Sequence, residues 1–132
     1  MPTMVVYFYQ DENKNAPVFE WLGNLLTHDK KAYAKCIAAI HFLASFGFEL
    51  RRPQADYLRD GIYELRIRKG HVHYRILYFF HGTDVVVLAN AIAKEGKVPD
   101  REIDRALLRK KQYEANPNKY KTEMEIKNAE KY

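Results

Sequence analysis

Basic side chains and histidines recur at alternate positions along one stretch of the chain, where their spacing suits them to bind phosphate. Residues 62–68 and 71–80 have the period of two that is typical of β-strands, and Lys69-Gly70 between them fits a two-residue hairpin turn. That turn predicts three cross-strand pairs: Arg68 with His71, Arg66 with His73, and Glu64 with Arg75. Opposed side chains stand on the same face, about 5 Å apart at Cβ, so one face is expected to carry five side chains that can be positive. Guanidinium forks and other cationic side chains bind phosphate without a metal.

Two interpretations of this basic face compete. The first is a solvated sheet surface on which Glu64 and Arg75 form a cross-strand ion pair. The second is a phosphate-binding site, which Lys94 and Lys97 beyond the next strand would extend. We favour the second for the face as a whole, because so many like charges on one strand pair repel one another unless an anion relieves them.

Other chemistries have weaker support in the sequence. His71, His73 and His81 are candidate metal ligands, but no carboxylate or cysteine at a useful spacing joins them. Cys36 falls on the apolar stripe of a predicted helix, which indicates a core residue and not a nucleophile. No nucleophile elbow, phosphate-binding loop or dinucleotide fingerprint is present.

The elements around the hairpin must position the basic face. We expect a strand at 5–9, a helix that opens at Pro17, a second helix that ends at Phe46-Gly47, a loop over 49–61, the hairpin, a strand at 85–92 and a helix that begins at Pro99. The order β-α-α-β-β-β-α predicts an α+β fold, in which a small antiparallel sheet packs on an N-terminal helical hairpin and a C-terminal helix. Residues 1–115 are expected to form one domain, and residues 116–132 a polar tail or frayed helix.

Composition narrows the class of protein. Hydrophobic residues make up 47% of the 132 positions, which excludes a disordered chain. The net charge of +5 favours an acidic partner, and the single cysteine excludes a disulfide framework. No apolar run is long enough to span a membrane and the first residues do not resemble a secretory signal, so we expect a cytoplasmic protein.

Four short motifs follow one another in a fixed order along the chain. In chain order they read Gly61-Ile62-Tyr63-Glu64-Leu65-Arg66, Tyr74-Arg75-Ile76-Leu77-Tyr78, Lys94-x-x-Lys97-x-Pro99 and Glu102-Ile103-x-x-Ala106. Over roughly residues 4–113 this series resembles the HigB-like, phage-related branch of the RelE/ParE toxin superfamily. The resemblance implies a RelE-like fold and a type II toxin that enters the ribosomal A site and cuts mRNA. It also implies a cognate helix-turn-helix antitoxin, similar to HigA, and no metal or other cofactor.

The resemblance also implies roles for individual residues. Arg66 looks like a basic catalytic position, Arg75 looks like the family's arginine on the next strand, and Lys94 is similar to a lysine of the K-K-x-x-K-x-P stretch. His73 is our candidate general acid or base, because an imidazole titrates near neutral pH. Arg75 is expected to point away from the core, so that its replacement leaves the fold intact. Three further residues are predicted to bind RNA: Arg68, His71 and Lys97.

Three positions depart from the family pattern. Ala93 replaces the first lysine of the K-K-x-x-K-x-P stretch, Glu64 stands where some RelE proteins carry a catalytic lysine, and Ile103 lies near the position of a tyrosine. Two alternatives stay open, the first because it shares the fold and the second because of Ala93 and Ile103. One is a ParE-like poison of DNA gyrase, and the other is an inactive relative that binds RNA.

Overall fold

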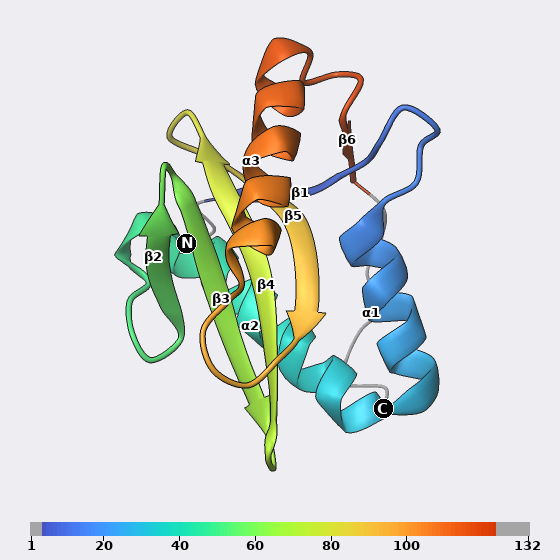
Figure 1. The fold of residues 1–132 in the computed structure, drawn as a ribbon, viewed down its shortest axis with the longest axis vertical. Helices are drawn as coiled ribbons and strands as arrows, with labels where there is room; N and C mark the ends of the chain where they lie inside the picture. Colours follow the sequence, from blue (N-terminus) through green and yellow to red (C-terminus); the bar gives the residue numbers. More distant parts are fainter. Residues whose placement is uncertain (1–3, 124–132) are drawn as a thin grey trace.

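Six strands and three α-helices form the part of the chain, residues 4–123, that the computed structural model describes (Figure 1). The elements follow in this order: β1 (Val5–Tyr9), α1 (Pro17–His28), α2 (Lys30–Phe46), a 3₁₀ turn η1 (Gly47–Glu49), β2 (Ala55–Arg59), β3 (Ile62–Lys69), β4 (Val72–His81), β5 (Val85–Ala93), α3 (Asp100–Ala115) and β6 (Lys121–Thr122). None of these helices is long and apolar enough to cross a membrane.

The strands form one sheet in the order β2-β3-β4-β5-β1-β6. Only β1 and β5 pair in parallel, and the other neighbours are antiparallel. The predicted α+β class is therefore confirmed, with a sheet larger than expected. The prediction of a loop over residues 49–61 is wrong, since β2 lies within it. A polar tail or frayed helix is expected from the sequence over residues 116–132; within it Lys121–Thr122 form β6, and residues 124–132 lie outside the described residues.

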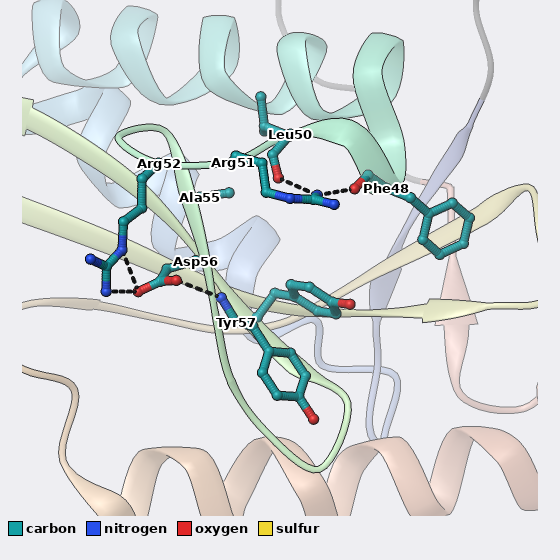
Figure 2. Close-up of a pocket in the computed structure, with 8 residues that line it drawn as sticks. Phe48, Leu50, Arg51, Arg52, Ala55, Asp56 and Tyr57 are labelled. Carbon is teal, nitrogen blue, oxygen red and sulfur yellow. Dashed lines mark hydrogen bonds and ion pairs between the residues drawn. The ribbon is translucent and has the colours of Figure 1, made fainter.

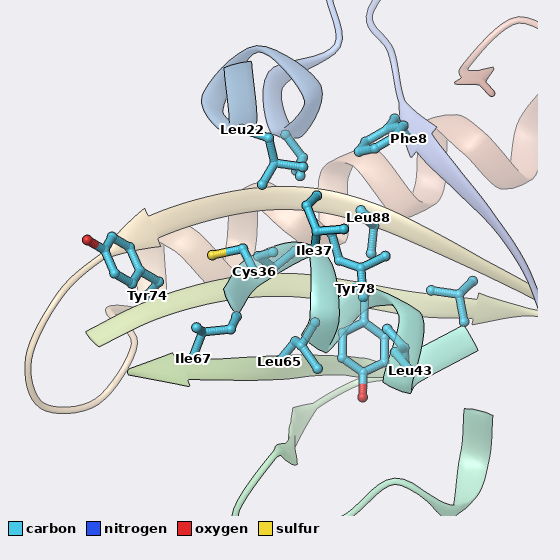
Figure 3. Packing of buried hydrophobic residues seen from close by; sticks show 14 of the residues in the cluster. Phe8, Leu22, Cys36, Ile37, Leu43, Leu65, Ile67, Tyr74, Tyr78 and Leu88 are labelled. Atoms are coloured by element: carbon cyan, nitrogen blue, oxygen red, sulfur yellow. The ribbon is translucent and has the colours of Figure 1, made fainter. Parts of the chain in front are cut away.

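Helices cover both faces of the sheet, and each face has its own hydrophobic core. The larger core lies between the sheet and the pair α1 and α2, where Cys36, Ile37, Leu65 and Tyr78 pack together (Figure 3). Burial raises the pKa of the Cys36 thiol to about 12, which agrees with its predicted place in the core. The smaller core lies under α3, on the opposite face (Figure 1).

The β3–β4 hairpin differs in register from the prediction. Lys69 pairs with Val72, so the two-residue turn is Gly70-His71 and not Lys69-Gly70. Gly70 has φ of +61°, a conformation that suits glycine at the first position of such a turn and strains lysine. The predicted cross-strand pairs are therefore wrong, but a slip of two residues keeps every side chain on its predicted face. The observed pairs in this region are Arg68 with His73, Arg66 with Arg75, and Glu64 with Leu77.

Candidate functional site

A cavity of about 600 Å³ opens on the α3 face of the sheet, between the β3–β4 hairpin and the segment that joins β5 to α3. Helix α3 covers only part of this face (Figure 1). A smaller cavity of about 240 Å³ adjoins the first, since Arg66, His73 and Arg75 line both. We call the larger cavity the basic groove and define it by its lining: Arg52, Asp56, Leu58, Arg59, Glu64, Arg66, His73, Arg75, Gly96, Lys97, Val98, Asp100 and Ile103.

Arg75 lies in the wall of the basic groove and is only 5% exposed. Its Nη1 donates to Glu64 Oε1 at 2.8 Å, and its Nη2 donates to the Gly96 carbonyl at 2.7 Å. Arg75 does face away from the larger core, as predicted, but Glu64 and the β5–α3 segment bury it. The guanidinium therefore fastens that segment to the sheet, and, against the expectation from the sequence, we now predict that its loss destabilises the fold.

The same groove is also lined by three residues whose side chains have no hydrogen-bond or ion-pair partner in the described part of the chain, residues 4–123: Arg66, His73 and Lys97. Arg66 stands directly opposite Arg75, a pairing of like charges that is unfavourable without a counter-charge. Glu64 neutralises Arg75, whereas Arg66 forms no ion pair in the described residues; its charge adds to that of Arg52 in lowering the pKa of the Asp56 carboxyl.

Two arginines of the groove were missed by the sequence analysis. Arg52 donates from Nε and Nη2 to Asp56 Oδ2 at 3.0 and 2.7 Å, and this pair holds the pKa of the Asp56 carboxyl below its usual range. Arg59 donates to Asp104 Oδ1 at 2.7 Å, which ties β2 to α3. Asp60-Gly61 could have revealed strand β2, because Asp-Gly is a typical two-residue hairpin turn. In the structure both residues have positive φ and join β2 to β3.

The remaining predicted site residues lie at the margins. Arg68 lines the smaller cavity and donates from Nε to the Gly70 carbonyl at 2.9 Å, while His71 is exposed in the turn. Lys94 is exposed after β5 and lines neither cavity, although its backbone N–H donates to the His73 carbonyl at 2.9 Å.

The histidines do not converge on a metal site. His71 and His81 lie at opposite ends of β4, and His81 packs edge-on against Tyr113 with ring centroids 5.0 Å apart. No group of three His, Cys, Asp or Glu side chains in the described part of the chain is arranged to hold a metal ion.

The groove is an open cavity whose lining has more basic than acidic side chains and one imidazole. Such a lining can bind a polyanion. Residues 23–111, which span every residue that lines it, match the family model described as Phage derived protein Gp49-like (DUF891). The chain belongs to this Gp49-like family. The family is a toxin family of toxin–antitoxin systems, within the RelE/HigB-like group, so membership implies an antitoxin partner. No curated protein matches the chain.

Proposed function

We propose that the basic groove binds the phosphates of mRNA and that this Gp49-like protein is a ribosome-dependent endoribonuclease that inhibits translation in the cytoplasm. One observation carries the proposal: three uncommitted side chains, Arg66, His73 and Lys97, line a single open cavity in a chain of a toxin family. A groove of this kind attracts phosphate by charge, and the guanidinium of Arg66 matches the geometry of phosphate oxygens.

The proposed reaction needs no metal. The ribose 2′-oxygen attacks the adjacent phosphorus, the bond from phosphorus to the 5′-oxygen breaks, and a 2′,3′-cyclic phosphate and a 5′-hydroxyl result. A base takes the proton of the 2′-hydroxyl and an acid supplies one to the departing 5′-oxygen. His73 is the candidate for one of these transfers, while Arg66 and Lys97 stabilise the charge that builds on the phosphate oxygens.

The other basic residues serve the substrate without entering the reaction. Arg75 holds the wall of the groove through Glu64 and Gly96. The three residues at the margins contact flanking phosphates of the message: Arg68, His71 and Lys94. The cognate antitoxin, a helix-turn-helix protein similar to HigA in this proposal, neutralises the toxin.

The test is translation in a cell-free bacterial extract with added protein, with mRNA ends mapped by primer extension. New ends are expected only on translated messages. Arg66→Ala is expected to reduce them about 10²- to 10³-fold, the usual effect of removing one group that stabilises a transition state. The matched control is Lys35→Ala, which removes a positive charge from the exposed side of α2, the helix on the opposite face of the sheet. Unchanged ends with both Arg66→Ala and His73→Ala refute the proposed site.

A chelator separates this proposal from cleavage that depends on a transition metal. Ribosomes require Mg²⁺, so the experiment must also verify that they remain assembled when the chelator is added to the extract with the purified protein. The chelator is therefore chosen to bind transition metals and leave Mg²⁺ in place. Cleavage is expected to continue, and its loss would return attention to the histidines.

The buried Arg75–Glu64 pair favours a second candidate, an inactive relative that binds RNA. An arginine already committed to a carboxylate has less to offer a transition state. This candidate predicts RNA binding by the purified protein with no new mRNA ends. A protein that neither binds nor cuts RNA directs the next experiment to gyrase supercoiling, the activity of a ParE-like poison.

A further inference from the structure

A second large cavity, of about 630 Å³, lies at the β2 edge of the sheet (Figure 2). Its volume falls within the range of about 300–1,000 Å³ that is usual for small-ligand sites. We call it the aromatic pocket and define it by its lining: Phe48, Leu50, Arg51, Arg52, Ala55, Asp56, Tyr57 and Tyr63. Figure 2 shows Phe48 and Arg51 on one side of the gap and Tyr57 on the other.

Two aromatic rings in this lining are exposed to solvent on one side and pack against other aromatic rings on the other. Phe48 is 46% exposed and packs on Phe80 with ring centroids 4.1 Å apart. Tyr57 is 53% exposed, contacts Tyr63 edge-on at 5.1 Å, and its hydroxyl accepts a hydrogen bond from the Gly61 N–H at 3.1 Å. Rings fixed in this way lose little entropy when a flat ligand stacks on them.

Arg51 adds a positioned cation to the pocket. Its Nη1 donates to the carbonyls of Phe48 and Leu50, and in the described residues it has no carboxylate partner. The backbone carbonyls thus hold the guanidinium in place without neutralising it. Its remaining N–H groups are free to donate to an anion or to the edge of a base.

The aromatic pocket continues into the basic groove. Arg52 and Asp56 line both cavities and pair with each other at 2.7 Å, Asp56 on the edge strand β2 and Arg52 in the turn before it. Tyr57 stands opposite Tyr63, on the same face of the sheet as Leu65, whereas Arg66 lies on the α3 face, so the two cavities lie on opposite faces and meet around the β2 edge. A single extended ligand can reach both cavities only by passing around this edge, over Arg52 and Asp56.

We propose that the aromatic pocket holds a nucleobase of the RNA strand whose phosphate lies in the basic groove, an inference that rests on the proposed function. Proteins that bind single-stranded RNA stack splayed bases on aromatic rings and pair the phosphates with arginine and lysine. Here Tyr57 and Phe48 supply the rings and Arg51 the cation. A protein partner is the less favoured occupant, because the one carboxylate in the lining is already paired and the open charge is positive.

The test is fluorescence anisotropy at low salt with a labelled 2′-O-methyl hexaribonucleotide, which cannot be cleaved. Removing one base–ring stack costs about 1–3 kcal/mol, which corresponds to a 5- to 150-fold rise in Kd for Tyr57→Leu. Phe48→Leu should weaken binding in the same direction, and Tyr57→Phe should restore it because it keeps the ring. The matched control is Phe42→Leu, whose side chain is 45% exposed but does not line the pocket. Urea unfolding verifies that each variant folds.

A second probe asks whether the ring meets a base. A set of hexanucleotides is used, each of which lacks the base at a different position. The wild type should bind one of them more weakly than the intact strand. Tyr57→Leu should bind that one no more weakly than it binds the intact strand. Additive losses at every position would overturn the proposal.

The outcomes separate this inference from the proposed function. Ring-dependent binding without mRNA cleavage supports the base site and refutes the nuclease. Cleavage, or binding that depends on Arg66 and Lys97 but not on either ring, overturns the base site and leaves the groove in place. RNA affinity unchanged in both ring variants, together with loss of the antitoxin complex, assigns the pocket to a protein partner. No binding by the wild type at low salt refutes both.

Discussion

The same two strands present opposite chemistry on the two faces of the sheet. On the α1–α2 face, Leu65 and Ile76 stand opposite each other and are fully buried. In the adjacent cross-strand pair, Arg66 and Arg75 stand opposite each other on the α3 face. Alternation along a strand makes both arrangements possible with one backbone. The apolar face is closed by two helices, whereas the charged face is only partly covered by α3 and stays open where the charges are.

The two faces also differ in what burial does for the side chains on them. An apolar pair needs only burial, and the helices supply it. A charged pair gains nothing from burial unless it is matched, and the groove matches one arginine with Glu64 while it leaves the other open. The open arginine costs stability and contributes nothing to the core, which is the pattern expected of a residue kept for binding. Four changes test this comparison, from the largest expected effect to the smallest.

Arg75→Ala should be the most damaging change in the groove. It leaves the Glu64 carboxylate buried without its partner, and breaking a buried pair in this way costs about 3–5 kcal/mol of unfolding free energy. Urea unfolding of the purified variant measures the loss. Replacing both residues, as Glu64→Met with Arg75→Met, should recover most of it, because a matched apolar pair carries no unpaired charge. A single variant that loses less than about 1 kcal/mol would contradict the role given to the pair.

Leu65→Ala tests the apolar face at the neighbouring position. The side chain is fully buried in the larger core, and its truncation should cost about 2–5 kcal/mol through lost burial and a residual cavity. Leu65→Met, which conserves volume, should cost less than about 1.5 kcal/mol in the same unfolding experiment. Equal losses for Ala and Met would mean that shape, and not burial, dominates this face.

The sequence determined the faces of the hairpin more reliably than its register. Alternation placed Arg66 and His73 on the face where the structure has them, because a face depends only on whether a position is odd or even. The register depended on which residue takes a positive φ, and Gly70 takes it where Lys69 was expected to begin the turn. Strand β2 was missed because its charged side chains hide the strand pattern, although Asp60-Gly61 marked the turn that follows it.

Tertiary contacts decided what local patterns could not. The burial of Arg75 depends on the Gly96 carbonyl, 21 positions away, and no period in the sequence reports that contact. The parallel pairing of β1 with β5 joins strands about 80 residues apart, which neither strand's own residues indicate. The aromatic pocket likewise forms only when η1, β2 and β3 come together, so its residues look unremarkable in the sequence.

Arg66→Gln should leave stability nearly unchanged and weaken RNA binding. The side chain makes no ion pair in the described part of the chain, so the free energy of unfolding should move by no more than about 0.5 kcal/mol. In anisotropy titrations over a range of salt concentrations, the slope of log K against log salt should become shallower by about 0.7, the value for one phosphate contact on a single strand. A loss of stability like that of Arg75→Ala would make Arg66 structural and remove the contrast between the two arginines.

Asp29→Asn should have the smallest effect, because its ion pair lies at the exposed rim of the apolar face. Asp29 contacts Lys69 Nζ at 2.7 Å and caps α2 through the Ala32 N–H at 3.1 Å. The hydrogen bond from Lys69, with that from Ala32, lowers the pKa of the Asp29 carboxyl. Its charge therefore stabilises the fold at pH above the unfolded pKa of about 3.9, and the contribution is lost as the pH falls through the lower folded pKa. Asparagine keeps the cap and removes the charge, so thermal unfolding should show the variant slightly less stable than the wild type at pH 6, with the gap closing towards pH 2. A gap that is constant with pH would mean that Asp29 acts through its cap alone, and that charge matters in this molecule only where the groove buries it or leaves it open for a ligand.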